Sequence, residues 1–250
     1  MAAAMFEFAN RHVLISGGTS GIGRAIALAF HAAGATVTVT GLLPAEVAGF
    51  GDAHSGPAAA PDITAVQLDV QDPAAITRLA DGTPNLDVLV NCAGMILRGG
   101  AEFDPVRFQQ VVDVNLHGTM RLCTAFRPHL ASSRGCIVNI ASMLSFFGSG
   151  FAPAYSASKG AIAQLTKSLA IAWAEQGIRV NAVAPGWIVT PLTQPLVDSP
   201  DRSQTIIDRT PLKRWGEPAD VAGAVQFLCS PAAAFITGVI LPVDGGYSVA

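Results

Sequence analysis

Residues 12–23 read His-Val-Leu-Ile-Ser-Gly-Gly-Thr-Ser-Gly-Ile-Gly, an apolar run that leads directly into a glycine-rich turn. The run at 12–16 is typical of a buried strand, and the Ala-rich segment at 24–33, which Gly34 follows, is typical of a helix. Thr and Val then alternate at 36–40, as in a second strand. A strand, turn, helix and strand within about 30 residues form a βαβ unit. This stretch therefore predicts an α/β fold.

The turn at 17–23 has the spacing Gly-x-x-x-Gly-x-Gly, which suits a bound dinucleotide. Glycines let the turn tighten, let the backbone approach a pyrophosphate, and let helix and strand pack closely. The N-terminus of the next helix presents N–H donors and a partial positive charge to the phosphates. A glycine turn alone could be purely structural, but its position between a strand and a helix favours dinucleotide binding. The candidate phosphate-binding residues are Gly17, Thr19, Ser20, Gly21, Ile22 and Gly23.

Apolar runs and helical segments alternate along the rest of the chain, while the Gly- and Pro-rich segment 49–61 predicts irregular loop. Seven strands with helices between them predict one Rossmann-type doubly wound domain over 1–250, with a parallel sheet covered by helices on both faces. Ligands of such sheets bind at the carboxyl ends of the strands. The further strands are expected at 63–68, 86–90, 136–140, 178–183 and 239–243, and the further helices at 73–80, from 105 past Asn115, at 154–175 and at 220–228.

The composition argues against several classes of function. Of the 250 residues, 50% are apolar and 13% are charged, which suits a parallel sheet buried on both faces. A net charge of −3 predicts no nucleic-acid partner. No apolar run approaches the roughly 20 residues of a membrane span, and the first residues lack the pattern of a secretory signal. The four dispersed cysteines suit free thiols in a reducing compartment, and the histidines lack metal-ligand spacing. We therefore expect a cytoplasmic protein without a membrane or metal site.

Tyr155 and Lys159 stand four residues apart in the segment Ala-Tyr-Ser-Ala-Ser-Lys at 154–159. On a helix, this spacing puts both side chains on one face, one turn apart. A nearby ammonium lowers the pKa of a phenol, which otherwise titrates near about 10. The spacing alone is common on helix surfaces. Because this helix follows Ser142, at the end of a predicted strand, we expect a hydride-transfer site with Tyr155 as acid or base and Ser142 holding the substrate oxygen.

The end of the second strand carries no charged residue that would choose between NAD and NADP. An acid about 20 residues after the glycine turn would hold the ribose 2′-hydroxyl of NAD, and an Arg would hold the 2′-phosphate of NADP. The sequence has Thr40-Gly41-Leu42-Leu43 there, and Ser20 in the turn is not basic. We predict NAD as the preferred cofactor and NADP as the alternative, because a 2′-phosphate needs a cation.

Seven motifs occur in order along the chain. They are the glycine turn at 17–23, Asn91-Cys92-Ala93-Gly94, Asn115, Ser142, Tyr155-x-x-x-Lys159, Pro185-Gly186 and Val243-Asp244-Gly245-Gly246. With these motifs, nearly the whole chain resembles the short-chain dehydrogenase/reductase family. The resemblance implies an NAD(P)-dependent enzyme that interconverts a small-molecule secondary alcohol and a ketone.

The resemblance also implies residue roles. Tyr155 would be the general acid in ketone reduction and the general base in alcohol oxidation, and Ser142 would donate to the carbonyl oxygen. Lys159 would bind the nicotinamide ribose and bias Tyr155, and Asn115 would hold a water of the proton relay. Asn91 and Asn115 could instead be satisfied polar groups that fix the fold, and Asp244 reads as part of a structural turn. The implied cofactor contacts beyond the glycine turn are Leu42, Asp69 and Val70 at the adenine, Asn91, Ala93 and Gly94 on the adenosine side, and Pro185, Gly186, Ile188 and Thr190, the last two at the carboxamide.

Family members are usually homotetramers in which the helix that carries Tyr155 packs against its copy, and we expect the same here. A face of small residues on that helix would permit close packing between subunits, and would equally suit packing within one subunit. Its members are Ala157, Ala161, Ala163 and Ala170.

The substrate is indicated by the segments around the site. The proline-rich segment 191–217 predicts a mobile substrate lid. Residues 208–216 and 141–146, with Arg98, resemble the sugar-acid branch of the family, which implies a sugar acid or polyol. Arg98 could meet a carboxylate or be solvated surface, and Leu144 and Trp187 are further candidate contacts. Aromatic residues near the site, Phe146, Phe147, Phe151 and Trp187, would also suit a bulkier apolar ketone.

Two alternative functions stay open. One is a 3-oxoacyl-thioester reductase, which would use the same catalytic groups. The other is a nucleotide-binding regulatory protein that has lost its chemistry, and the intact Asn115, Ser142, Tyr155 and Lys159 argue against it.

Overall fold

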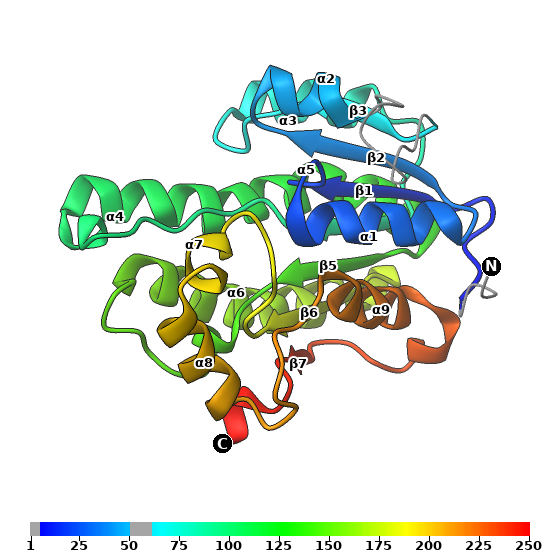
Figure 1. Cartoon of the computed structure of the whole chain (residues 1–250). Coiled ribbons are helices and arrows are strands. Elements are labelled where there is room, and N and C mark those ends of the chain that lie inside the picture. The colour runs from blue at the N-terminus through cyan, green and yellow to red at the C-terminus, as the bar shows by residue number, and fades with distance from the viewer. Residues whose placement is uncertain (1–5, 51–61) are drawn as a thin grey trace.

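Seven parallel strands form a single sheet in the order β3-β2-β1-β4-β5-β6-β7. The computed structural model describes residues 6–50 and 62–250 (Figure 1). The strand order reverses between β1 and β4, which is the switch point of a doubly wound sheet, so the predicted fold class is confirmed. The strands are β1 (His12–Ser16), β2 (Thr36–Gly41), β3 (Thr64–Gln67), β4 (Val88–Asn91), β5 (Cys136–Ile140), β6 (Arg179–Pro185) and β7 (Ile240–Val243).

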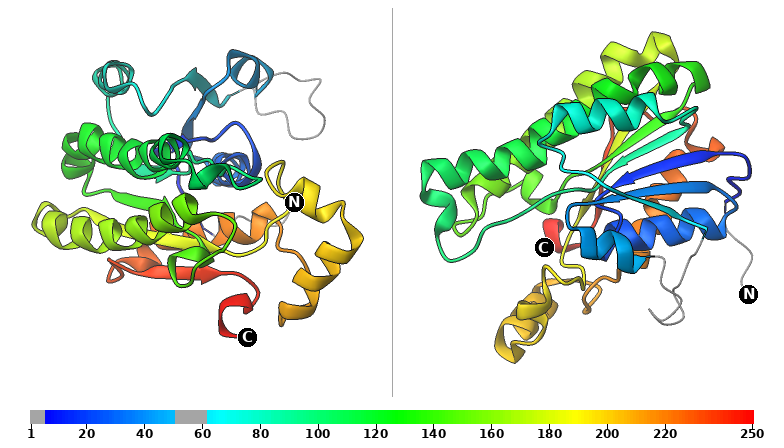
Figure 2. Two further views of the ribbon diagram at one scale, coloured as in Figure 1. Left: turned by 90° about the vertical axis from the view of Figure 1, so that its left-hand side faces the viewer. Right: turned by 90° about the horizontal axis from the view of Figure 1, so that it is seen from above.

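Helices cover both faces of the sheet (Figure 2). On one face, α1 (Gly21–Ala32) and α9 (Pro218–Cys229) pack against each other and share a core with alternate strand residues such as Val13 and Ile15. On the other face, α3 (Pro73–Asp81), α5 (Gly118–Ser133) and α6 (Pro153–Trp173) share a second core, to which Leu14 belongs. Neighbouring β1 residues thus point into opposite cores, as the two-residue period of a strand requires.

The register of the strands brings their carboxyl ends to one edge. Ser16 of β1 pairs with Asn91 of β4, and Asn91 pairs with Asn139 of β5. The segments that follow these strands therefore emerge side by side. The short helices α7 (Gln194–Val197) and α8 (Pro200–Arg209) stand beside the same edge, where the strand arrows end in Figure 1.

One helix departs from the sequence prediction. Residues Pro44–Phe50 form α2, whereas the sequence predicts irregular loop from Gly49 onward. Phe50 is buried in the core beneath α1, and this contact holds the short helix although Gly49 lies near its end. The rest of the predicted loop, 51–61, lies outside the described residues.

The helix predicted from residue 105 past Asn115 is confirmed and runs further. It consists of α4 (Pro105–Val112), one π-helical turn at Asp113–His117, and α5. A π-turn widens a helix locally and is frequent at functional sites. Here the π-turn contains Asn115, which is buried and lies beside α6.

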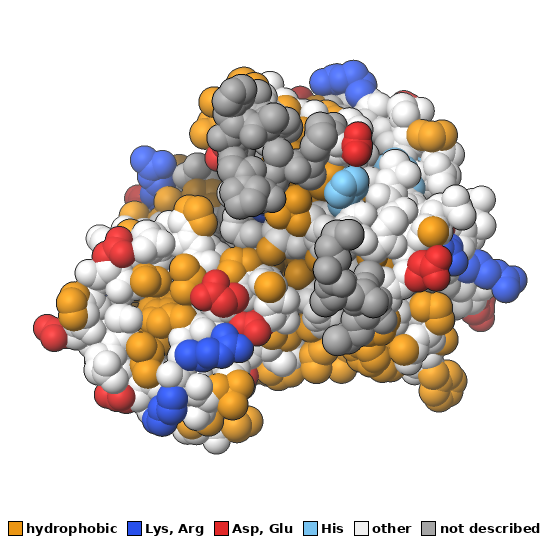
Figure 3. All heavy atoms as spheres, turned by 45° about the vertical axis from the view of Figure 1, so that its right-hand side comes forward, with side chains coloured by type: hydrophobic (Ala, Val, Ile, Leu, Met, Phe, Trp, Pro, Cys, Tyr) orange, Lys and Arg blue, Asp and Glu red, His pale blue; other side chains and the backbone are white. Residues whose placement is uncertain are grey.

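The surface carries scattered charge. On the face shown in Figure 3, Lys and Arg side chains lie singly among acidic and apolar ones and form no continuous basic patch on the coloured surface. Within residues 6–50 and 62–250, no helix combines the length and the hydropathy that crossing a bilayer requires.

Candidate active site

The glycine turn connects β1 to α1 and lies flat against the end of β4. Gly17 has φ +65°, and a Cβ there would come within 2.7 Å of the Ala93 backbone. A Cβ on Gly23 would come within 2.2 Å of the Gly17 carbonyl oxygen. Only glycine fits these close approaches. Ser20, the N-cap of α1, makes no side-chain cap hydrogen bond, so it leaves the first N–H groups of the helix to another acceptor. These features fit a pyrophosphate at this position.

A cleft of about 540 Å³ runs from the glycine turn to Tyr155 and Lys159, and we call it the cofactor cleft. Most of the predicted cofactor residues line it, together with several that sequence reasoning missed. The predicted lining residues are Gly17, Thr19, Ser20, Gly21, Ile22, Gly23, Leu42, Asp69, Val70, Ala93, Gly94, Tyr155, Lys159 and Thr190, and the missed ones include Glu46, Gln71, Cys92, Met95, Gln110, Val114 and Pro191.

Tyr155 and Lys159 line one end of this cleft, and Ser142, which is not among the lining residues, acts on the Tyr155 phenol. Ser142 acts to lower the pKa of that phenol, and the Ser142 hydroxyl accepts the Leu144 N–H at 3.1 Å. The Lys159 ammonium is buried, donates to the Ile140 carbonyl at 2.6 Å and lies 5.6 Å from the centroid of the Tyr155 ring. The end of β5 thereby holds the ammonium, and the start of α6 holds the phenol.

Burial dominates the protonation of both groups. It raises the pKa of Tyr155 to about 12, although Ser142 acts in the opposite direction. Burial also lowers the pKa of Lys159 to about 8. The phenol of the protein by itself is therefore harder to ionise than a free tyrosine, and the lowering of its pKa by Lys159 stays a prediction. Burial disfavours the phenolate by more free energy than the neighbouring groups contribute in its favour. The ammonium is itself destabilised by burial.

Asn115 uses its side chain to fix the loop after β4. Its Nδ2 donates to the Met95 carbonyl and to the Ser158 hydroxyl, both at 3.0 Å, and its Oδ1 accepts the Met95 N–H at 2.8 Å. It also lies beside Lys159, since a Cβ on Gly94 would be 3.3 Å from Asn115 Oδ1 and 3.7 Å from Lys159 Nζ. The structural reading of Asn115 is thus observed, and its part in a proton relay stays a prediction.

Asn91 does not line the cofactor cleft. Its side chain is buried, where Nδ2 donates to Asn139 Oδ1 at 2.9 Å and to Cys123 Sγ at 3.2 Å. The alternative reading of Asn91, a buried polar group within the fold, is thus observed, and its contact with the adenosine side stays a prediction. Its neighbours Cys92 and Ala93 form the cleft wall instead.

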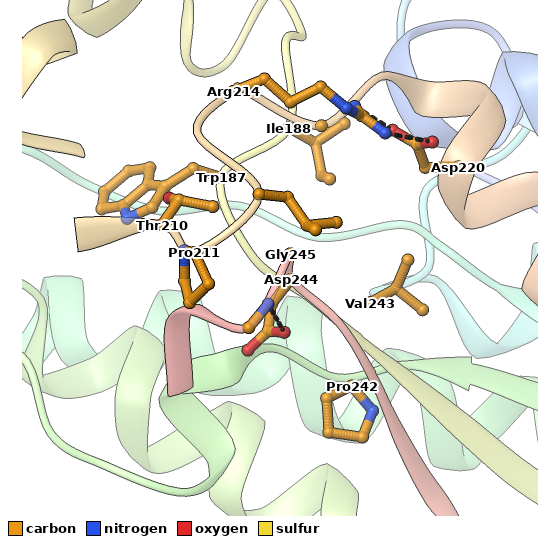
Figure 4. Close-up of a pocket in the computed structure, with 13 residues that line it drawn as sticks. Trp187, Ile188, Thr210, Pro211, Arg214, Asp220, Pro242, Val243, Asp244 and Gly245 are labelled. Carbon is orange, nitrogen blue, oxygen red and sulfur yellow. Dashed lines mark hydrogen bonds and ion pairs between the residues drawn. The ribbon is translucent and has the colours of Figure 1, made fainter. Parts of the chain in front are cut away.

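The predicted cofactor contacts at the end of β6 and after it do not all line the cofactor cleft. Thr190 lines the cofactor cleft, but Pro185 and Gly186 do not, and a Cβ on Gly186 would come within 2.6 Å of Asp244. Ile188, a predicted carboxamide contact, lines a second cavity of about 530 Å³ instead (Figure 4). Asp244 accepts the Gly246 N–H at 3.0 Å, as the predicted structural turn requires.

The candidate substrate residues lie on different parts of the site. Arg98 donates to the Leu192 carbonyl at 2.7 Å, which ties the loop after β4 to the first residues of the predicted lid. Trp187 packs edge-on against Trp215 and Tyr247 at centroid distances of 5.9 and 6.3 Å and lines the second cavity. The Trp187 indole Nε1 is buried without a hydrogen-bond partner in the described structure.

Two further groups beside the phenol escaped sequence reasoning. The pKa of the Cys92 thiol is raised to about 11, mainly by burial, so the thiol stays neutral near pH 7. Glu102 is fully buried and accepts the backbone N–H of Tyr155 at 3.0 Å. No local pattern marks Glu102, because it reaches Tyr155 across 53 residues of sequence.

Comparison with known proteins agrees with this geometry. A family model described as enoyl-(acyl carrier protein) reductase matches residues 17–248. The galactitol 2-dehydrogenase (L-tagatose-forming) of Cereibacter sphaeroides is 41% identical over 98% of this chain and 98% of its own length. The 2-dehydro-3-deoxy-D-gluconate 5-dehydrogenase of Bacillus subtilis is 40% identical over 97% and 96%. A gluconate 5-dehydrogenase structure from Burkholderia cenocepacia, in complex with NADP and tartrate, matches with a TM-score of 0.90 at 32% identity and covers 100% of both chains. The ordered motifs, the sheet and these relatives together show that the chain belongs to the short-chain dehydrogenase/reductase family.

Proposed function

We propose that this protein interconverts a secondary alcohol and a ketone on a polyol or sugar acid, by moving a hydride to or from a nicotinamide cofactor. The observation that carries the proposal is the pair Tyr155 and Lys159 at the end of the cofactor cleft, with Ser142 acting on the Tyr155 phenol. The glycine turn at the other end offers the phosphate site that such a cofactor needs.

The three side chains have separate tasks in this proposal. When bound, the nicotinamide ring takes or supplies the hydride and, in its oxidised form, carries positive charge. Ser142 donates a hydrogen bond to the substrate oxygen, and Tyr155 gives it a proton in reduction or takes one in oxidation. With a pKa of about 12, the phenol is protonated at neutral pH, which is the form that ketone reduction needs. Oxidation needs the phenolate. With a pKa five units above 7, forming the phenolate at pH 7 costs about 7 kcal/mol, which nearby positive charge must help to offset.

The substrate class is supported by the relatives. Galactitol is a polyol, and 2-dehydro-3-deoxy-D-gluconate is a sugar acid. Both relatives are aligned over nearly the whole of this chain, so the same class of substrate is proposed here. Residues 191–217, which the Arg98 side chain meets at Leu192, are proposed as the substrate lid.

NAD is proposed as the preferred cofactor. Among the described residues that line the cofactor cleft, the cation is Lys159, at the Tyr155 end. The lining near Leu42 instead includes the acidic Glu46. A carboxylate would repel a 2′-phosphate and could accept a hydrogen bond from a 2′-hydroxyl. The Burkholderia relative was solved with NADP, so both cofactors belong in the assay.

A cytoplasmic homotetramer is proposed as the working form. The side chains of Phe103, Val106 and Ile171 are 67%, 76% and 81% exposed, which supports burial against other subunits. Of the small-residue face on α6, Ala163 and Ala170 are buried within the subunit, so a contact between copies of α6 would use exposed positions such as Ala157. Light scattering of the purified protein measures the oligomeric state.

A substrate panel tests the proposed activity. Polyols, sugar acids, hydroxy steroids and 3-oxoacyl thioesters are each assayed with NAD and NADP in both directions by nicotinamide absorbance. Turnover is expected on a polyol or sugar acid and absent in Tyr155→Phe, which should still bind the cofactor. Turnover on acyl thioesters alone would favour the thioester reductase, and tight cofactor binding without turnover on any substrate would favour the regulatory protein.

A further inference from the structure

Glu102 is a buried carboxylate that the proposed mechanism does not use. It lies in a 3₁₀ turn at Ala101–Phe103, between β4 and α4, and its relative exposure is 0%. Its two oxygens each accept one backbone N–H, from Leu97 at 2.9 Å and from Tyr155 at 3.0 Å. Acidic side chains are rarely buried so completely, and here each carboxyl oxygen has one backbone donor.

The bond to Tyr155 caps the catalytic helix. Tyr155 is the third residue of α6, so its N–H belongs to the first turn, where no carbonyl of the same helix is available. The N-cap residue, Ala152, makes no side-chain cap hydrogen bond. Glu102 supplies the missing acceptor from a distant part of the chain, and its negative charge suits the positive end of a helix. Its second oxygen ties the same point to the loop after β4.

We propose that Glu102 is the positioning residue of the acid-base centre: it anchors the Tyr155 backbone and holds a fixed negative charge beside the phenol. The role rests on the proposed function of Tyr155. Because like charges repel, the carboxylate favours the protonated phenol over the phenolate, and it therefore favours the form that donates a proton to a ketone.

The other groups around the phenol do not supply this charge. Ser142, after β5, acts to lower the pKa of the phenol, while Lys159 of α6 brings positive charge. Cys92, after β4, would raise the pKa of Tyr155 as a thiolate, but its own pKa is about 11. Among these groups, Glu102 is thus the carboxylate that acts to raise the pKa of Tyr155.

The test is a tyrosinate titration, which needs neither substrate nor cofactor. The chain has two tyrosines, so Tyr247→Phe leaves Tyr155 as the single source of tyrosinate absorbance. In that background, Glu102→Gln removes the charge and keeps the shape and one acceptor oxygen. We expect the Tyr155 midpoint to fall by about half a pH unit, the scale of one charge several Å away at an effective dielectric between protein and water. An unchanged or higher midpoint in the folded variant would overturn the proposal.

Asp104→Asn is the matched control. Asp104 stands two residues away, is exposed, and caps α4 through the Val106 and Arg107 N–H groups at 3.1 and 3.0 Å. The control removes the same charge and also weakens a helix cap, but not that of α6. Its midpoint should match that of the parent, and a shift equal to that of Glu102→Gln would refute a specific role for Glu102.

Kinetics separate positioning from general stability once a substrate is known. In Glu102→Gln, the pH profile of alcohol oxidation should move to lower pH by the same interval, with the dissociation constant of the cofactor unchanged. Glu102→Asp keeps the charge on a shorter arm, so kcat should fall while the midpoint stays, and this variant carries the test if Glu102→Gln does not fold. If the Tyr155 midpoint in Glu102→Asp fell as far as it does in Glu102→Gln, the proposed role of the charge would be contradicted. If no substrate is found, the titration still decides the inference, and the proposed function fails separately.

Discussion

The Lys159 ammonium is expected to reduce the stability of the fold, and Lys159→Met measures by how much. The side chain is 4% exposed, and burial lowers its pKa from 10.5 to about 8. At about 1.4 kcal/mol per pKa unit, keeping this group charged in the folded protein costs on the order of 3 kcal/mol. Methionine has a similar length and no charge. It also removes the 2.6 Å hydrogen bond to the Ile140 carbonyl, a loss of about 1–2 kcal/mol. We therefore expect the variant to be about 1–2 kcal/mol more stable at pH 7 and inactive.

The pH dependence gives the sharper assay. Below the folded pKa of about 8, Lys159 is charged in both states and the full cost is present. Between about 8 and 10.5, the unfolded chain binds more protons than the folded one, so the stability of the parent protein rises with pH. The advantage of Lys159→Met in urea unfolding should therefore shrink from pH 7 to pH 9.5. Lys167→Met, an exposed position on the same helix, should show neither effect. A Lys159→Met protein that is less stable at pH 7, or whose advantage does not vary with pH, would refute the reasoning.

Three further predictions concern catalysis and binding. Since the pKa of Tyr155 is raised, alcohol oxidation should increase with pH from neutral to alkaline while ketone reduction stays level, and an oxidation rate that is flat with pH would contradict this. Gly23→Ala places a Cβ 2.2 Å from the Gly17 carbonyl, so calorimetry should show cofactor affinity at least tenfold lower, whereas Gly160→Ala, in open space, should bind normally. Arg98→Ala removes the hydrogen bond to the Leu192 carbonyl. Because this bond is proposed to hold the lid, KM should rise about tenfold for neutral polyols and sugar acids alike. A rise in KM for sugar acids alone would instead make Arg98 a carboxylate receptor.

The order of the elements and the pair Tyr155 and Lys159 follow from the sequence alone. The glycine turn, the apolar strands and the Pro and Gly at helix ends act on the backbone within a few residues, so their effect can be read locally. The four-residue spacing of Tyr155 and Lys159 is likewise a property of one helix. The helix α2 was missed because its anchor, Phe50, is held by a core that the local pattern does not show.

The contacts that the side chains of the site make depend on how distant segments pack together. The packing places the Asn91 side chain against Asn139 of β5. It also brings Arg98 to the Leu192 carbonyl, 94 residues away, and Glu102 to the first turn of α6. Burial in the folded chain also sets the pKa values of Tyr155 and Lys159. The pKa of the phenol is raised, whereas a neighbouring ammonium alone would lower it. The physical reason is that burial and long-range hydrogen bonds depend on which segments meet in space, and the energy of a charge depends on the water that those segments exclude.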